Sequence, residues 1–246
     1  MIYYSLGKNI KAFTTDRTVG RDPYLLCPLV GVKPERFARP HQVHEDIVYT
    51  ISEDFFLLPY AEQREQLEGI DAVITDVTDA CIGISTADCI PVLVYDPTHH
   101  VAAAIHAGWK GTVKRIVEKS IDEMARKYNT APSECTAIIG PGIEQVSFEV
   151  GQEVVERFKE AGFDIERHTV MMPNTLRGEL PEEKPHIDLK EINRQQLLAK
   201  GLHEQNITVS PIDTFTDEHY FSARREQKGN IKCGRILTGF VLMHNA

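Results

Sequence analysis

Cys89 and His106 stand at the two ends of a segment that has the pattern of a β-hairpin. Cys89 ends the run TADC and His106 begins HAGWKG, and IPVLVYDPTHHVAAAI between them reads as strand, turn and strand. If residues 97–98 form a tight turn, Cys89 lies directly opposite His106 on one face, with Cβ atoms roughly 4.5–5.5 Å apart. A thiolate and an imidazole at that separation can share one zinc ion at about 2.0–2.3 Å. The pair therefore predicts a metal site.

Candidates for a third ligand lie in the segment RPHQVHEDIVY, which holds His41 and His44 just before a predicted strand. Three protein ligands leave one coordination position free, and this is the arrangement of catalytic zinc. The spacing alone does not choose between the two histidines. The alternative is that these histidines lie in the core or on the surface and bind no metal.

The hairpin that carries Cys89 and His106 is apolar on both faces. One face holds Pro91, Leu93, Tyr95, Ala102 and Ala104, and the other holds Ile90, Val92, Val94, Val101, Ala103 and Ile105. Because both faces are apolar, the hairpin must be covered on both sides. The sequence therefore predicts a layered α+β architecture. Other strands are predicted at residues 47–51, 72–75, 81–85, 136–139, 207–209 and 236–243.

Three segments have the apolar periodicity of helices. One runs from Lys110 to Tyr128 and a second covers residues 152–161. A third begins at Asp188, where the D-x-x-E spacing has the form of a capping box, and ends at Gly201. We expect these helices to flank the sheets.

The chain shows no repeat or obvious linker, so residues 1–246 are predicted to form a single domain. The segment 171–185, with three prolines and several acids, is predicted to be a surface loop. No apolar run approaches the ~18 residues of a membrane span, and the N-terminal segment lacks the apolar stretch of a signal peptide. A cytoplasmic protein is expected.

Charge and cysteine content exclude several classes of protein. The net charge is −9 and no block of Lys or Arg forms a footprint for nucleic acid, so neither nucleic acid nor a membrane surface is an expected partner. The five cysteines are widely spaced without a CxxC pair, which favours reduced thiols over a disulfide framework. No sequence feature specifies an oligomeric state.

Several motifs of this chain resemble those of the YfiH-like family, whose members carry laccase-domain or polyphenol oxidase names. The motifs are HQVH at 41–44, DAVITD at 71–76, TADCIPVLVYD at 86–96, HAGWKGT at 106–112, IGPGI and FEVG within 139–151, and YFSARRE with GRI within 220–236. They stand in the family's order and cover the chain from about Pro40 onward. TADC together with HAGW is highly specific.

The resemblance implies a layered α/β/β/α fold with mixed sheets, similar to that of CNF-like hydrolases. It also implies a mononuclear zinc ion, preferred over copper, bound by His44, Cys89 and His106. The activity that it implies is phosphorolysis of purine nucleosides such as adenosine, inosine and guanosine, with adenosine deamination. The expected partners are therefore a purine nucleoside and phosphate.

This chain departs from the family pattern at three positions. Glu45 replaces the glycine of QVHG, Ala223 stands where many relatives have Tyr or His before Arg224, and Gly142 replaces the cysteine of GPCI. None of these changes removes a predicted zinc ligand. The loss of a polar side chain at position 223 is a change that could shift the substrate range.

Other residues near these motifs are candidates for catalysis or substrate binding. Asp88 is predicted to be catalytic or to orient a ligand, although a plain backbone or turn hydrogen bond is the alternative; Asp71 and Glu149 are alternative orienting carboxylates. For phosphate, the helix start at Trp109 and Lys110 and the guanidinium groups of Arg224 and Arg225 are candidates. Trp109 is also a candidate to stack a base, against the alternative of a core position, and the arginines could instead form structural ion pairs.

Two other functions fit the same residues. In a cysteine hydrolase of the deamidase type, Cys89 would be the nucleophile and His106 its base. In a non-catalytic binding protein, the zinc ion would be structural. A true multicopper oxidase is disfavoured because the chain has no H-x-H pair, and the signatures of cytidine deaminases and of GxSxG, HExxH, P-loop and GxGxxG proteins are missing as well.

Overall fold

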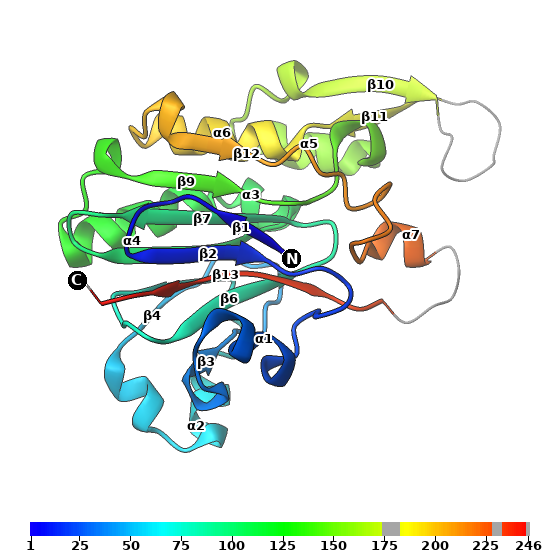
Figure 1. Cartoon of the computed structure of the whole chain (residues 1–246). Coiled ribbons are helices and arrows are strands. Elements are labelled where there is room, and N and C mark those ends of the chain that lie inside the picture. The colour runs from blue at the N-terminus through cyan, green and yellow to red at the C-terminus, as the bar shows by residue number, and fades with distance from the viewer. Residues whose placement is uncertain (174–182, 228–232, 245–246) are drawn as a thin grey trace.

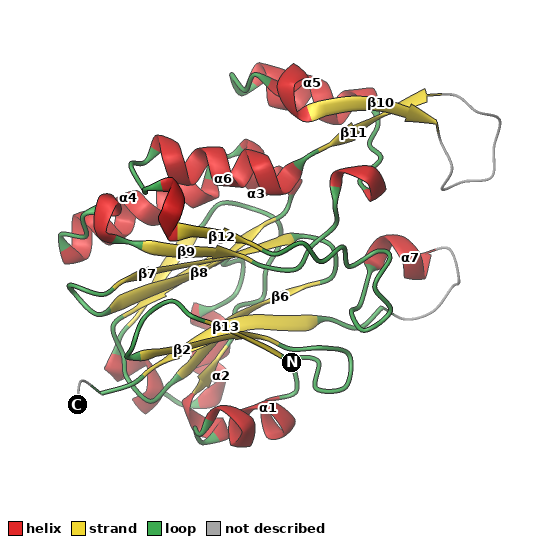
Figure 2. Ribbon diagram, turned by 45° about the horizontal axis from the view of Figure 1, so that its top comes forward, coloured by secondary structure: helices red, strands yellow, loops and turns green. Residues whose placement is uncertain are grey.

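Two β-sheets pack face to face, and helices cover both of their outer faces (Figure 2). The computed structural model describes residues 1–173, 183–227 and 233–244. The order of layers is therefore helices, six-stranded sheet, five-stranded sheet and helices, with a separate two-stranded ribbon at one side (Figure 1). This arrangement confirms the α/β/β/α prediction.

The six-stranded sheet has the order β12-β9-β7-β8-β5-β4. Its strands are β4 (Val48–Ile51), β5 (Ala72–Thr75), β7 (Ile90–Asp96), β8 (Val101–Ala107), β9 (Thr136–Ile139) and β12 (Ile207–Val209). The hairpin β7–β8 lies at its centre, where β7 pairs antiparallel with both β8 and β9. The outer pairs β12–β9 and β4–β5 are parallel, so the sheet is mixed.

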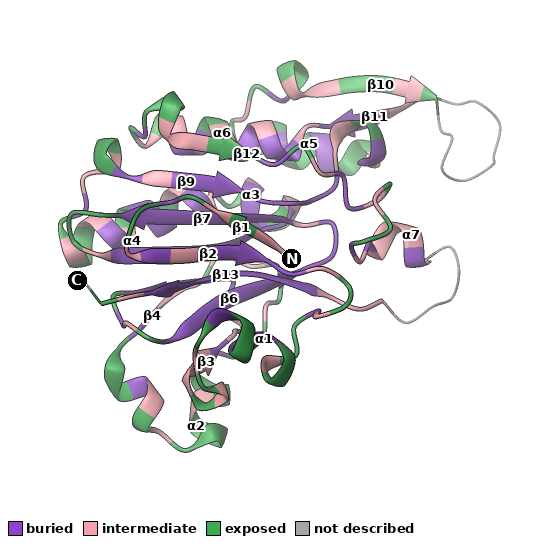
Figure 3. Cartoon of the chain, in the orientation of Figure 1, coloured by how far each residue is buried: buried purple, intermediate pink, exposed green. Residues whose placement is uncertain are grey.

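The five-stranded sheet has the order β1-β2-β13-β6-β3. Its strands are β1 (Ile2–Tyr4), β2 (Ile10–Thr14), β3 (Phe37–Ala38), β6 (Cys81–Thr86) and β13 (Ile236–Leu242). β13 is central and pairs antiparallel with β2 and β6, whereas β3 is parallel to β6. The inner strands β6, β7, β8 and β13 are fully buried, whereas the edge strands β1, β4 and β12 are mostly partly or fully exposed (Figure 3).

Helices contribute the two outer layers. The structure places α1 (Pro23–Val30), α2 (Tyr60–Gln66), α3 (Trp109–Val113), α4 (Ile116–Tyr128), α5 (Gln152–Glu160), α6 (Leu189–Ala199) and α7 (Ala223–Gln227). Buried apolar residues of α4, α5 and α6 pack on one face of the six-stranded sheet, and Leu26 and Val30 of α1 pack on the outer face of the five-stranded sheet. Within the described residues, no helix has the length and apolar character needed to cross a membrane.

The hairpin β7–β8 is buried on both faces, as predicted. Its even-numbered β7 residues face α4, and its odd-numbered ones, including Leu93 and Tyr95, face the other sheet. The predicted register was wrong by two residues, because Pro91 and not Cys89 pairs with His106. The turn is longer than predicted, spanning residues 97–100. A shift of two residues keeps every side chain on its face, so Cys89 and His106 still face the same side.

Two predicted elements differ from the structure. The helix predicted from Lys110 to Tyr128 is split into α3 and α4, because Arg115 adopts a left-handed conformation with φ of 61°. The segment 171–185 is not entirely a loop: its ends belong to the antiparallel strands β10 (Thr169–Pro173) and β11 (Glu183–Ile187). Its middle, residues 174–182, lies outside the described part of the chain.

Candidate metal centre

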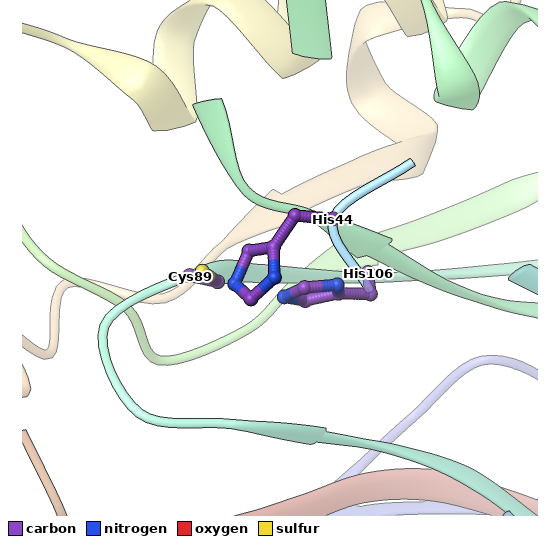
Figure 4. A group of neighbouring side chains, drawn as sticks. All are labelled: His44, Cys89 and His106. Carbon is purple, nitrogen blue, oxygen red and sulfur yellow. The ribbon is translucent and has the colours of Figure 1, made fainter. Parts of the chain in front are cut away.

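The candidate site lies where the chain crosses between the two sheets. Residues 87–89 connect the end of β6 in one sheet to the start of β7 in the other, and they place Cys89 at the open end of the hairpin. His106 lies near the end of β8, and His44 lies in the loop before β4. These three side chains point toward one another (Figure 4).

The ligand atoms of His44, Cys89 and His106 all lie within 4.8 Å of one another. The two imidazole rings are 4.8 Å apart between centroids and lie at 73° to each other. His106 is buried, Cys89 is partly buried and His44 is exposed, so the group opens toward solvent on the His44 side. The group could hold a metal ion with one position open to a reactant.

His44, rather than His41, joins Cys89 and His106. The His41 ring instead forms a hydrogen bond of 2.5 Å between its Nδ1 and Oε1 of Glu68, and both side chains are largely exposed. The structure thus brings together the three side chains that the family resemblance implied as ligands.

Asp71 positions two of the three candidate ligands. Its fully buried carboxylate lies 2.7 Å from Nδ1 of His106, and it accepts backbone N–H bonds from Val43, His44 and Glu45 at 2.8–3.2 Å. With Nδ1 of His106 held by Asp71, Nε2 is left to serve as the ligand atom. One carboxylate thus fixes both the ring of His106 and the loop that carries His44.

The backbone is strained at two points of the site. His44 and Asp88 both lie in the left-handed region, with φ of 65° and 85°. Such a conformation costs a non-glycine residue on the order of 1–3 kcal/mol and persists only where the surroundings enforce it. At His44 the bonds that three successive backbone N–H groups donate to Asp71 provide that enforcement.

Charges within the site support one another. Burial alone would raise the pKa of Cys89, but the two neighbouring imidazoles outweigh it and lower the pKa to about 6. Burial would lower the pKa of His106, but the Cys89 thiolate and the Asp71 carboxylate raise it to about 9. In Asp71 the hydrogen bonds from His106 and the loop outweigh burial and lower the pKa. The free site therefore favours a thiolate, which is the form of cysteine that binds metals.

Gly108 leaves space for an ion. A Cβ atom at this position would lie 2.9 Å from Sγ of Cys89 and 3.3 Å from Cδ2 of His44. The backbone of Gly108, with φ of −66°, would accept any residue. The glycine is therefore explained by the room that the converging ligands need and not by its conformation.

Asp88 binds the C-terminal segment instead of the candidate ligands. Its carboxylate accepts hydrogen bonds from the hydroxyls of Thr214 and Ser222 and from the backbone N–H of Arg224, at 2.7–3.0 Å. Burial raises its pKa, against the effect of these donors. These contacts favour the predicted alternative of a backbone and turn hydrogen-bond partner: Asp88 holds the start of α7 against the cavity.

A cavity of about 510 Å³ opens beside the three ligands. Its lining includes two aromatic side chains and four arginines: Trp109, Phe148, Arg21, Arg39, Arg224 and Arg235. The volume is typical of pockets that bind small molecules. Of the predicted substrate residues, Trp109 and Arg224 thus lie at the cavity.

Lys110 and Arg225 do not line this cavity. Lys110 is exposed, and its Nζ lies 5.7 Å from the Trp109 ring centre. The Arg225 guanidinium donates hydrogen bonds to the backbone carbonyls of Thr214, Phe215, Asp217 and Tyr220. These contacts favour a structural role for Arg225, because they hold the segment before α7 in place.

Two departures from the family pattern also lie near the cavity. Ala223 is part of its lining, so its small side chain leaves room that a Tyr or His would fill. At Gly142 a Cβ atom would lie 2.5 Å from Cδ1 of Ile90. A cysteine at position 142 would require Ile90 to move.

Sequence reasoning missed Arg21, Arg39 and Arg235 as parts of the site, and it did not predict that Gly108 leaves room between the ligands. Arg235 was within reach, because it belongs to the GRI motif. Arg39 was also within reach, because it begins the segment RPHQVHEDIVY, whereas Arg21 lies far from every motif in sequence and only the folding of the chain brings it to the cavity.

Fold and site together define a layered α/β/β/α protein with one candidate mononuclear His–Cys–His centre. The chain belongs to the family described as multi-copper polyphenol oxidoreductase laccase, whose model matches residues 3–243. This match confirms the resemblance seen in the motifs.

Proteins with assigned names are among its relatives. A purine nucleoside phosphorylase from Bacteroides thetaiotaomicron is 40% identical over 91% of this chain and 80% of its own length. Adenosine deaminase RL5, from an unknown prokaryotic organism, is 40% identical over 87% of this chain and 78% of its own length.

Solved structures share the fold. The hypothetical protein YfiH of Bacillus licheniformis superposes with a TM-score of 0.80 at 23% identity, over 95% of this chain and 92% of that one. YlmD from Geobacillus stearothermophilus superposes with a TM-score of 0.78 at 23% identity, over 96% of this chain and 93% of that one.

Proposed function

We propose that this chain is a zinc-dependent purine nucleoside phosphorylase that also deaminates adenosine. The observation that carries the proposal is the convergence of His44, Cys89 and His106 beside a cavity of about 510 Å³. Relatives at 40% identity named as a purine nucleoside phosphorylase and an adenosine deaminase supply the substrate class.

Zinc is the metal that the donor set favours. Two imidazole nitrogens and one thiolate, with a fourth position free, match the ligand number and types of catalytic zinc. Copper also accepts such ligands, and the family description refers to several copper ions. Among the described residues, however, this is the single group of three such side chains whose ligand atoms converge. A coupled multi-copper cluster has no matching ligands there.

Side chains of the protein position the candidate ligands and line the cavity. Asp71 orients His106 and the His44 loop, and Asp88 fixes the start of α7, which places Arg224 at the cavity. Trp109 and Phe148 offer apolar surfaces against which a purine can pack. A zinc ion, when bound, would supply Lewis-acid polarisation beside the nucleoside.

Turnover by metal-quantified protein tests the proposal. Protein with one zinc per chain should release free base from inosine in the presence of phosphate, and it should release ammonia from adenosine. Removal of the metal with a chelator should abolish both reactions, and added zinc should restore them. Zinc-loaded protein that converts neither nucleoside would refute the proposal.

One observation favours a second candidate, a cysteine hydrolase. Asp71, His106 and Cys89 form a sequence of carboxylate, imidazole and thiol in which the thiol pKa is lowered to about 6. This is the order of groups that activates a cysteine nucleophile. The third candidate ligand, His44, has no role in that mechanism.

Alkylation separates the two candidates. Cys233 lines the same cavity, but burial and Glu226 raise its pKa to about 12, so it serves as an internal control. In metal-free protein, iodoacetamide should modify Cys89 above about pH 6 and spare Cys233. Stoichiometric zinc should protect Cys89. A hydrolase would instead show activity in metal-free protein that alkylation abolishes.

A further inference from the structure

Arginines gather on the lining of the cavity although the chain as a whole is acidic. The net charge is −9, yet Arg21, Arg39, Arg224 and Arg235 all line this cavity. Among its described lining residues, Asp88 is the one carboxylate, and Thr214, Ser222 and the N–H of Arg224 already occupy both of its oxygens. The arginines of the lining thus outnumber its one carboxylate.

Among these arginines, Arg39 has a buried donor that lacks an acceptor within the described residues. Its Nε is buried and has no hydrogen-bond partner among the residues that the structure describes, and its Nη1 donates to Oγ of Ser85 at 3.4 Å. Burial, together with the charges of Arg21 and Arg64, lowers its pKa to about 10. A buried donor without an acceptor destabilises the folded protein, and a charged donor does so more strongly. A bound anion would remove that destabilisation.

Arg21 and Arg235 extend the same charged surface. Each of the pairs Arg39–Arg21 and Arg21–Arg235 is close enough for one charge to lower the pKa of its neighbour. Arg235 donates through Nη1 to the carbonyls of Cys233 and Gly234, which fixes the direction of its guanidinium. Within the described part of the chain, none of these three arginines forms an ion pair with a carboxylate.

We propose that Arg21, Arg39 and Arg235 form the binding site for inorganic phosphate, replacing Lys110 and Arg225 in that role. Guanidinium groups present paired N–H donors that match the oxygens of a phosphate dianion. The site shares its cavity with the candidate metal ligands, so a phosphate held there lies beside the nucleoside. This inference rests on the proposed function and names the residues that bind its second substrate.

The reaction balances with this assignment. A phosphate oxygen forms a bond to C1′ of the ribose while the bond from C1′ to N9 of the purine breaks. The bonding electron pair leaves with the base, and the proton of hydrogen phosphate is transferred to it. The products are ribose 1-phosphate and the free purine. The three arginines hold the nucleophile, and their charge remains paired with phosphate from start to finish.

Phosphorolysis and deamination provide an internal comparison, because deamination of adenosine consumes water and no phosphate. We expect Arg39→Gln to raise the KM for phosphate by roughly tenfold to a hundredfold, because the substitution removes a charge-assisted hydrogen bond. The KM for inosine should change by less than about threefold, and the ratio of phosphorolysis to deamination should fall. Arg21→Gln, at an exposed position, tests the same site without a risk to folding.

A matched control and a direct binding assay complete the test. Arg157→Gln removes an exposed arginine on α5, away from the cavity, and should leave the KM for phosphate unchanged. An unchanged KM for phosphate in both cavity variants would overturn the inference. If the wild-type protein turned over no nucleoside, the proposed function would fail. Calorimetric titration with inorganic phosphate would still decide the inference. Weaker binding of phosphate by Arg39→Gln than by the wild type supports it. Equal binding by the two proteins, or no binding by the wild type, refutes it.

Discussion

Each end of the β7–β8 hairpin has a buried carboxylate that contacts a histidine, but only one of the two pairs belongs to the candidate metal centre. At the open end, Asp71 accepts three backbone N–H bonds from the His44 loop and contacts Nδ1 of His106. At the turn, Asp96 accepts N–H bonds from Thr98 and His99 and contacts Nδ1 of His99 at 2.8 Å. In each case a buried carboxylate organises a loop and orients one histidine.

The difference lies in what surrounds each histidine. His106 is 3% exposed and faces a thiol and a second imidazole beside a cavity. His99 is 36% exposed, and the search of the described residues finds no converging group of ligands around it. A carboxylate–histidine pair is therefore a structural device in its own right. It becomes a candidate catalytic site only where further ligands and a cavity meet it.

Replacing Cys89 should break the comparison most severely. Cys89→Ala removes the one sulfur ligand of the candidate centre, so the protein should lose stoichiometric zinc and turnover should fall to background. Elemental analysis and the two nucleoside assays measure this. His99→Ala, the matched change at the turn end, should retain both. Retained zinc with lost turnover in Cys89→Ala would favour Cys89 as a nucleophile.

Asp71→Asn should have the next largest effect. The amide keeps the shape of the carboxylate, but its NH2 group must face a donor, either Nδ1–H of His106 or a backbone N–H of the His44 loop. Loss of such an orienting partner typically weakens metal binding by about 10–100-fold. Competition with a chromogenic chelator gives the affinity. Wild-type affinity in this variant would show that Asp71 does not orient the ligands.

Gly108→Ala should have a smaller effect, on metal binding alone. The new methyl group would lie 2.9 Å from Sγ of Cys89, so we expect roughly a tenfold loss of zinc affinity with little change in the melting temperature of the metal-free protein. Gly151→Ala is the control. It also replaces a glycine at a helix start, with φ of −80°, and the three atoms nearest to its methyl group would all belong to the flexible carboxylate of Glu153. Equal losses in both variants would contradict the steric argument.

Sequence patterns were sufficient for the hairpin but not for its turn. The unbroken run of apolar residues from Ile90 to Tyr95 predicted a strand buried on both faces, because such a run places apolar side chains on each face. The turn length depended on Asp96, whose side chain accepts from Thr98 and His99 and stabilises a longer turn. The error was an even number of residues, which is why the candidate ligands were still placed on one face.

Elements stabilised mainly by distant contacts were the ones missed. Arg115, which lies between α3 and α4, adopts a left-handed conformation; besides Glu118, its guanidinium contacts two distant groups, the carbonyl of Ala161 and the Phe163 ring. Neither partner is close in sequence. The same holds for Arg39, which reaches Ser85 on another strand. Local periodicity carries no information about such contacts.

Asp96→Asn should have the smallest effect on the metal and a measurable one on stability. Burial would raise the Asp96 pKa, but the hydrogen bonds from His99 and from the backbone N–H of Thr98 outweigh burial and lower it. Because its pKa is lowered on folding, the carboxylate stabilises the protein at pH values above its ordinary pKa of about 4. This stabilisation is lost as the pH falls below about 4. Asn does not titrate, so the free energy of unfolding of the wild type should exceed that of the variant by about 1–3 kcal/mol at pH 7.

That difference should shrink as the pH falls below about 4, which urea denaturation at a series of pH values would measure. Asp71 titrates in both proteins, so its contribution cancels in the difference. Zinc affinity should be unchanged, because the turn lies at the opposite end of β7 and β8 from Cys89 and His106. If Asp96→Asn weakened zinc binding as much as Asp71→Asn, the two ends of the hairpin would be coupled through the strands. The carboxylate at the turn would then be part of the site.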